Sequence, residues 1–265
     1  MGRLECVLRA ALPGQPERLT QLDEAIRAPL PLNTAVGLLG AGPDAPTALA
    51  GALLAGVLAA RRPHRVLAVA AAAGEPSITR QAGLAGAATS SDDAISRRST
   101  ATTGEQASAG LARSDGGVWC LDLAGDPSGW WQGVAPINRF FDFVVTDWGS
   151  PADAGDARAT SAVLLVVTAA RRDCLQAGVD LVAQMTTPAV APLLVVHDTA
   201  TGTERGLREA TAANDGLWLP DDPGLRRVPD GPGRGLRYGT NRAVLELAAA
   251  VVTAGATRTL EGARR

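Results

Sequence analysis

The chain has 265 residues and a net charge of −2, which suits one large α/β domain and gives no basic field to attract nucleic acid or an anionic membrane. Its lysine and arginine total of 25 consists entirely of arginine. Mechanisms that need a lysine amine, such as Schiff-base formation or phosphate binding by a P-loop lysine, are therefore excluded. With two histidines in the whole chain, histidine-rich metal sites are excluded as well.

Strand and helix patterns alternate along the chain after a polar, proline-interrupted lead-in over residues 1–33. Apolar runs predict strands, and alanine-rich or amphipathic segments predict helices. Strands are expected at 34–39, 65–69, 118–123, 141–146, 162–168, 193–197 and 217–219, and helices at 46–62, about 173–184 and 242–253. Because strands separated by helices need crossover connections, we expect one three-layer α/β domain over residues 34–265, with a mainly parallel sheet and helices on both faces.

The cysteine pattern and the apolar runs bear on the compartment. Cys6, Cys120 and Cys174 lie far apart without a Cys-x-x-Cys pair, which predicts buried thiols in a reducing environment. The N-terminus lacks the apolar core of a signal peptide, and the stretch 45–60 contains two glycines and predicts a buried helix rather than a membrane span. We therefore expect a cytoplasmic protein without direct membrane insertion.

The loop after the first strong strand fits two phosphate-binding patterns in part. In a dinucleotide fingerprint, Gly40, Gly42 and Ala45 match the three small positions between a strand and a helix. That pattern needs an acid at the end of the second strand, and none occurs there before Glu75. It leaves a Rossmann-type oxidoreductase or flavoprotein with NAD or FAD as one alternative.

The other pattern is the P-loop, G-x-x-x-x-G-K-[ST]. Gly40 takes its first position and Thr47 its last, whereas Ala45 and Pro46 replace the second glycine and the lysine.

A Walker B strand supports the P-loop interpretation. Residues 142–147 form an apolar run that ends in Asp147, the place of an acid that orients magnesium. Trp148 and Gly149 follow, where a glycine-containing switch is expected.

With these motifs in place, the chain resembles the MinD/ParA family of deviant P-loop ATPases, in particular the MinD-like proteins found beside type VII secretion genes. Five segments carry the resemblance in the right order, namely 26–30, 61–69, 141–149, 219–222 and 237–250. The resemblance implies a P-loop NTPase fold, a nucleotide site at Gly40, Gly42, Thr47 and Asp147, and pairing with a second family member across the nucleotide face.

The departures from the family pattern fall on its chemistry. The signature lysine, which in the family reaches the partner's nucleotide, is Ala41, and the Walker lysine is Pro46. The aspartate that ends the second strand and opens the first switch is Ala70. Since phosphoryl transfer depends on positive charge and donors around the γ-phosphate, these changes indicate a degenerate site.

Asp44 and Pro46 predict how the helix after the loop begins. Pro46 has no N–H and suits the first turn of a helix, and Asp44, two positions before it, is a favoured N-cap residue. We predict that Asp44 caps the following helix. In one version its carboxylate occupies the place of a β-phosphate, and in the other it is a purely structural cap.

Other candidate residues are interpreted as structural. His197-Asp198 has no accompanying nucleophile and is predicted to be a structural or loop histidine, and the acid pairs 92–93 and 221–222 are predicted to be solvated. Trp130-Trp131, with Phe140-Phe141, is predicted to be either core or a partner surface. Residues 257–265 contain one large apolar side chain, too few for a membrane-binding amphipathic helix.

The function expected from the sequence is that of a MinD/ParA-like P-loop protein with a degenerate nucleotide site and no cofactor. It would act as a non-catalytic scaffold or regulatory partner linked to a secretion or cell-envelope system. Homodimers, or heterodimers with a MinD/ParA-like paralogue, are the expected assemblies. The alternatives are an ATP- and magnesium-binding switch that uses arginines in place of the lysines, and the NAD- or FAD-binding oxidoreductase.

Overall fold

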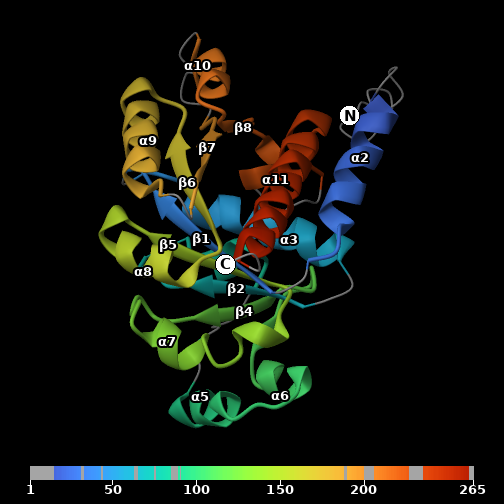
Figure 1. The fold of residues 1–265 in the computed structure, drawn as a ribbon, viewed down its shortest axis with the longest axis vertical. Coiled ribbons are helices and arrows are strands. Elements are labelled where there is room, and N and C mark those ends of the chain that lie inside the picture. Colours follow the sequence, from blue (N-terminus) through green and yellow to red (C-terminus); the bar gives the residue numbers. More distant parts are fainter. Residues whose placement is uncertain are drawn as a thin grey trace.

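The computed structural model describes residues 15–30, 33–42, 44–62, 65–74, 76–84, 89, 91–187, 190–199, 206–226 and 235–262. Its strands form one eight-stranded sheet in the order β3-β4-β2-β5-β1-β6-β7-β8 (Figure 1). The strands are β1 (Thr34–Gly40), β2 (Val66–Ala70), β3 (Ala112–Arg113), β4 (Trp119–Asp122), β5 (Phe143–Gly149), β6 (Val163–Ala169), β7 (Leu193–His197) and β8 (Leu217–Leu219). Only the β3–β4 pair among these is antiparallel, so the expected mainly parallel sheet is confirmed.

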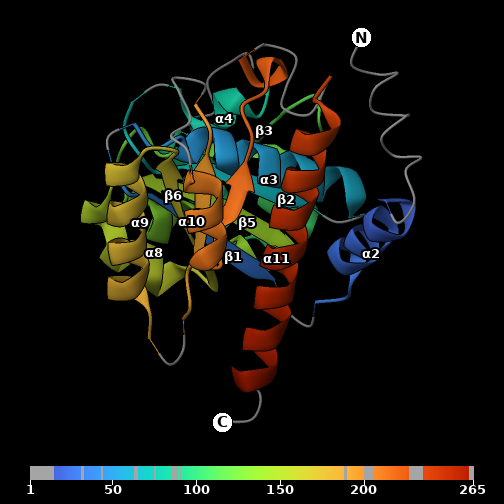
Figure 2. The same ribbon diagram turned by 90° about the horizontal axis from the view of Figure 1, so that it is seen from above.

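Helices cover both faces of the sheet, as the crossover connections require. The helices are α2 (Gln15–Arg27), α3 (Thr47–Arg61), α4 (Ile78–Gln81), α5 (Asp92–Ser99), α6 (Gly104–Ser108), α7 (Gly129–Gly133), α8 (Ala154–Thr160), α9 (Arg172–Met185), α10 (Leu207–Ala213) and α11 (Tyr238–Gly262). Buried side chains of α2, α3, α4 and α11 share one core with the sheet, and those of α6 to α10 share the other. Figure 2 shows the strands between the α8–α9 layer and the α11–α2 layer.

The central strands are apolar on both faces, which is why their sequences read as continuous apolar runs. Every residue of β1, β2 and β6 is buried. β1 pairs with β5 on one side and with β6 on the other, so the carboxyl ends of these strands meet at one edge of the sheet. That edge positions the loop after Gly40 next to the end of β5.

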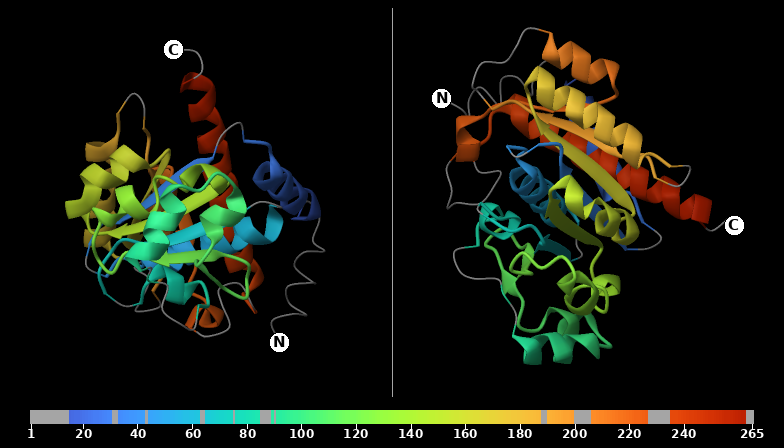
Figure 3. Two further views of the ribbon diagram at one scale, coloured as in Figure 1. Left: turned by 90° about the horizontal axis from the view of Figure 1, so that it is seen from below. Right: turned by 90° about the vertical axis from the view of Figure 1, so that its left-hand side faces the viewer.

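The sequence predicted most of these elements, with shifts at their ends. β7 and β8 have the expected bounds, whereas β5 begins at Phe143 and continues past Asp147 to Gly149. The polar segment 90–112 contains the short helices α5 and α6, which lie at the opposite end of the molecule from α9 and α10 (Figure 3, right). In the described parts of the chain, no helix combines the length and apolar character needed to cross a bilayer.

Helix α2, inside the segment expected to be a lead-in, joins the body through Arg62. The Arg62 side chain is buried, and its Nη1 donates to the carbonyl oxygens of Ile26 (2.6 Å) and Ala28 (2.9 Å). Its Nε donates to Asp142 Oδ2 at 3.4 Å, and the guanidinium lies over the Phe143 ring. Because Arg62 follows the last residue of α3, one side chain ties α2, α3 and the start of β5 together.

We predict that Arg62→Ala lowers the free energy of unfolding by about 3 kcal/mol, because buried carbonyl acceptors and Asp142 lose their donor. The matched control is Arg27→Ala, which removes an exposed pair with Asp23 and should change the free energy by less than about 0.5 kcal/mol. Urea unfolding measures both. Equal costs for the two variants would contradict the tie described above.

Candidate functional site

The loop between β1 and α3 closes on itself through its own backbone. The Ala45 amide donates to the Gly42 carbonyl at 3.2 Å, and the Thr47 amide donates to the Ala45 carbonyl at 2.9 Å. The Ala41 amide donates to the Val167 carbonyl of β6 at 2.9 Å. Pro46 has no amide hydrogen, so positions 41, 45, 46 and 47 offer no free amide donor to a phosphate.

Close packing inside the loop explains Gly40. A Cβ at this position would lie 2.9 Å from both the Ala45 Cβ and the Gly149 carbonyl oxygen. The first glycine of the pattern is therefore required by the approach of the loop to the end of β5. Gly42 has a φ of +151° and open space around its Cα. Glycine is therefore favoured at this position by the backbone conformation and not by close packing.

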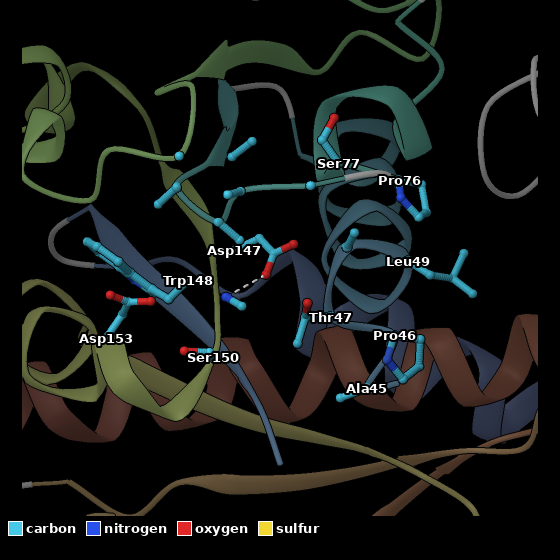
Figure 4. Close-up of a pocket in the computed structure, with 18 of the residues that line it drawn as sticks. Ala45, Pro46, Thr47, Leu49, Pro76, Ser77, Asp147, Trp148, Ser150 and Asp153 are labelled. Atoms are coloured by element: carbon cyan, nitrogen blue, oxygen red, sulfur yellow. Dashed lines mark hydrogen bonds between the residues drawn. The ribbon is translucent and has the colours of Figure 1, made fainter. Parts of the chain in front are cut away.

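Asp147 lies at the carboxyl end of β5 and faces Thr47, the first residue of α3 (Figure 4). Its side chain is 3% exposed, and its Oδ1 accepts from the Gly149 amide at 3.0 Å. The Thr47 side chain faces the same carboxylate. Burial raises the pKa of Asp147 to about 6, and the nearby Thr47 hydroxyl and the Gly149 amide hold the pKa below the value that burial alone would give.

The alanine run after β2 packs against the same strand end. The amides of Ala71 and Ala72 both donate to the Asp147 carbonyl, at 3.0 and 2.9 Å. Gly149 has a φ of +70°, and a Cβ there would lie 2.6 Å from the Ala72 Cβ. The position at the end of β2 that carries an aspartate in the family pattern is Ala70, which is buried, so this position supplies no carboxylate to the site.

These loops enclose a cavity of about 800 Å³, called here the carboxyl-edge cavity. Its described lining contains three carboxylates, from Asp44, Asp147 and Asp153, and no basic side chain. The walls are largely alanine and proline, with Leu49 of α3 on one side. The cavity is therefore negatively charged and otherwise mostly apolar.

Of the residues predicted for the site, the structure brings Gly42, Asp44, Thr47 and Asp147 to the cavity lining, with Gly40 directly beneath the loop. Asp153 was missed. It follows the turn Gly149-Ser150 and precedes α8, and no motif spacing identifies it from sequence. Figure 4 places Asp153 and Trp148 across β5 from Thr47.

The predicted cap by Asp44 is wrong. Helix α3 begins at Thr47 with Pro46 as its N-cap residue, and no side chain caps it. The Asp44 carboxylate is largely exposed and pairs with Arg171 Nη1 at 3.5 Å. The physical reason is the conformation of Pro46, whose ψ of 57° turns the chain so that Asp44 lies outside the first helical turn.

The remaining candidates divide between surface and core. Trp130 is buried and its Nε1 donates to the Thr146 hydroxyl, whereas Trp131 is 50% exposed. Asp92 and Asp93 are exposed at the start of α5, as predicted. His197 is buried at the end of β7, and burial lowers its pKa.

The prediction of a solvated acid pair at 221–222 is wrong for Asp222. This carboxylate is 1% exposed and accepts the amides of Gly224 (2.8 Å) and Arg237 (2.6 Å). It therefore connects the segment after β8 to the residues just before α11. Cys120 and Cys174 are buried, as predicted, and Cys6 lies outside the described residues.

The strand order contradicts the dinucleotide alternative. In the Rossmann order the first two strands of the motif are neighbours, whereas here β5 lies between β1 and β2. β2 also ends in an alanine run without an acid, and Glu75 lies outside the described residues. The loop after Gly40 is therefore not part of a Rossmann dinucleotide site.

Comparison with known proteins agrees with this topology. No protein-family model and no curated protein matches the chain. Among solved structures, the cell division ATPase MinD of Pyrococcus furiosus is similar with a TM-score of 0.62 and 18% identity, covering 84% of this chain and 99% of that one. A ParA family ATPase from Chlorobium tepidum has a TM-score of 0.64 and 12% identity, covering 82% and 98%.

MinD in the MinC:MinD cell division protein complex of Aquifex aeolicus is also similar, with a TM-score of 0.57 and 15% identity over 83% of this chain and 96% of that one. At these identities the similarity establishes the fold. The chain has the α/β fold of the MinD and ParA ATPases.

Asp147 predicts a pH dependence of stability. Its pKa rises from 3.8 to about 6 on folding, so the contribution to stability is fully present below pH 4 and is lost as the pH rises through 6. A shift of this size corresponds to about 3 kcal/mol. We predict that Asp147→Asn is more stable than the wild type at pH 8 and no more stable at pH 4, measured by urea unfolding. The same difference at both pH values would contradict an ionised buried carboxylate.

Proposed function

We propose that this MinD/ParA-like protein has lost nucleotide-driven chemistry and acts as a non-catalytic scaffold or regulatory partner. The supporting observation is the loop between Gly40 and Thr47, in which the amides of Ala41, Ala45 and Thr47 donate to carbonyl groups of the protein and Pro46 has no amide hydrogen. Two of the family's lysine positions are Ala41 and Pro46, and no described basic side chain lines the cavity. The proposed site is therefore a remnant made of Gly40, Gly42, Asp44, Thr47 and Asp147.

The fit of a magnesium nucleotide can be tested on the residues present. Thr47 and Asp147 fit a magnesium ion, since a hydroxyl and a carboxylate oxygen are ligands that this ion prefers. A triphosphate does not fit, because its negative charge would enter a cavity that already holds Asp44, Asp147 and Asp153. The residues thus match the metal and not the phosphates, and we derive no catalytic step.

Protein partners are the second part of the proposal. The Aquifex aeolicus MinD structure is a complex with MinC, and pairing with another protein is what we propose for this chain, as a homodimer or with a MinD/ParA-like paralogue. The link to a type VII secretion or cell-envelope system rests on the sequence resemblance of the five segments named above. We propose a cytoplasmic location from the cysteine pattern, which predicts buried thiols in a reducing environment.

One observation favours the ATP-binding switch as a second candidate. Arg171, just after β6, places a guanidinium beside the loop through its pair with Asp44. That guanidinium is also bonded to Asp173, at 3.2 Å between Nη2 and Oδ2. To reach a phosphate it would have to leave two carboxylates, so this candidate is the weaker one.

We predict that saturating Mg-ATP and Mg-ADP leave the melting temperature of the purified protein unchanged. A nucleotide present at about 100 times its dissociation constant would stabilise the protein by about 2.7 kcal/mol, which thermal unfolding detects readily. A shift that disappears in Thr47→Ala would contradict the non-catalytic proposal and favour the switch.

A gain-of-function variant tests whether the changes at positions 45 and 46 are the reason that nucleotides do not bind. Ala45→Gly combined with Pro46→Lys restores the second glycine, an amide donor and the phosphate-binding charge. We expect this variant to gain a melting-temperature shift with Mg-ADP that the wild type lacks. The control is Pro76→Lys, which adds a positive charge to another wall of the cavity without restoring the loop. A shift in the control alone would contradict the role given to the loop.

A further inference from the structure

We propose that His197, the last residue of β7, is a pH-sensitive switch whose protonation opens the turn at 220–226 and the first turn of α11. The side chain is 7% exposed, and neither ring nitrogen has a hydrogen-bond partner among the described residues. Leaving buried polar atoms without partners costs free energy, and native proteins keep few of them. The imidazole is therefore held in the interior by its surroundings and not by bonds of its own.

Strand register places the ring on the face of the sheet that α11 covers. His197 lies two positions after Val195 and pairs with Leu219 of β8. Both of these residues belong to the core shared with α11 and not to the core shared with α9 and α10. Since side chains two positions apart on a strand point to the same face, the His197 side chain lies on the α11 face.

The direction of α11 brings its first turn to the same edge of the sheet. A Cβ at Gly255 would lie 3.0 Å from the side chain of Thr34, the first residue of β1. Tyr238 begins the helix 17 positions earlier, or roughly 25 Å away, whereas a strand as long as β1 spans about 20 Å. The start of α11 therefore lies at the carboxyl edge, where β7 ends at His197.

The turn at 220–226 connects this edge to α11. It follows Leu219, the β8 residue paired with His197. Asp222 holds it to the residue before α11, because its buried carboxylate accepts the amides of both Gly224 and Arg237. A disturbance at the end of β7 thus acts on the turn and on the start of the helix together.

The surroundings of the ring disfavour the imidazolium. Burial lowers the pKa of His197, and the carboxylates of Asp221 and Asp198 oppose that effect without cancelling it. The N-terminus of α11 adds positive potential at the same edge. A proton on the ring is therefore better accommodated when the turn opens and water reaches the imidazole.

Other ionisable groups on the adjoining elements do not offset this. Arg171, which follows β6, carries positive charge and is bonded to two carboxylates. Asp222 is occupied by its two backbone amides. Arg237, before α11, is exposed and positive, and Tyr238 is neutral in the pH range concerned. These groups leave the neutral ring as the favoured form of the closed turn.

The sign of the pH dependence follows. An exposed histidine has a pKa of about 6.5, and that of His197 in the closed turn is lower. The closed turn is therefore favoured above pH 6.5, and it loses stability relative to the open form as the pH falls below that value. At pH 5.5 an exposed imidazole is protonated about ten to one, so the open form gains by up to about tenfold.

Nuclear magnetic resonance tests the first step without any change at His197. The chain contains two histidines, so spectra of the wild type and of His64→Gln assign the His197 ring signals. We expect the His197 ring to titrate with a midpoint below pH 6.5. A midpoint at or above 6.5 would overturn the proposal.

Hydrogen exchange tests the opening. After correction for intrinsic exchange rates, we expect protection of residues 217–226 and 235–245 to fall by up to about tenfold between pH 7.5 and 5.5 in the wild type and in His64→Gln. His197→Phe and His197→Gln, which do not titrate, should show no such fall. Asp147 titrates in all four proteins, so its contribution cancels in the comparison.

An equal loss of protection in the wild type and in either His197 variant would contradict the switch. The proposal goes beyond the proposed function, because a degenerate nucleotide site requires nothing of His197. A melting-temperature shift with Mg-ADP would overturn the proposed function and leave the switch standing, so the two fail separately.

Discussion

The buried carboxylate of Asp147 fixes the arrangement of the whole carboxyl edge. Its side chain accepts the Gly149 amide and faces Thr47, and its carbonyl accepts the amides of Ala71 and Ala72. One residue of β5 thereby holds the start of α3 and the end of β2 in place. Burying the Asp147 carboxylate costs free energy. The packing of the fully buried strands β1 and β2 beside it offsets that cost.

The small residues around Asp147 follow from that arrangement. The loops approach each other backbone to backbone, and added Cβ atoms at Gly149 and Gly125 would lie 2.6 and 2.8 Å from the Cβ atoms of Ala72 and Ala73. Glycine at positions 149 and 125 is therefore a packing requirement of the alanine run.

Sequence spacing was sufficient to bring Gly40, Thr47 and Asp147 together, because strand ends of a parallel sheet meet at one edge. It was insufficient for Asp44, since the cap depended on the ψ angle of Pro46, which spacing does not reveal. It was insufficient for Asp222 as well, because its partner Arg237 lies fifteen positions further along the chain and the contact depends on tertiary packing. The three carboxylates that line the cavity come from the loop after β1, the end of β5 and the segment before α8, and the motifs identified the first two.

The charge of the site also follows from the N-terminus of α3. A helix N-terminus attracts negative charge, and in a P-loop the ligand's phosphates supply it. Here Asp147 lies against the first residue of α3, so the protein provides that negative charge from within. Once the helix end is satisfied internally, further negative charge from a ligand meets Asp44 and Asp153 with no lysine to balance it. A triphosphate would therefore add negative charge at a helix end whose own negative charge already comes from Asp147.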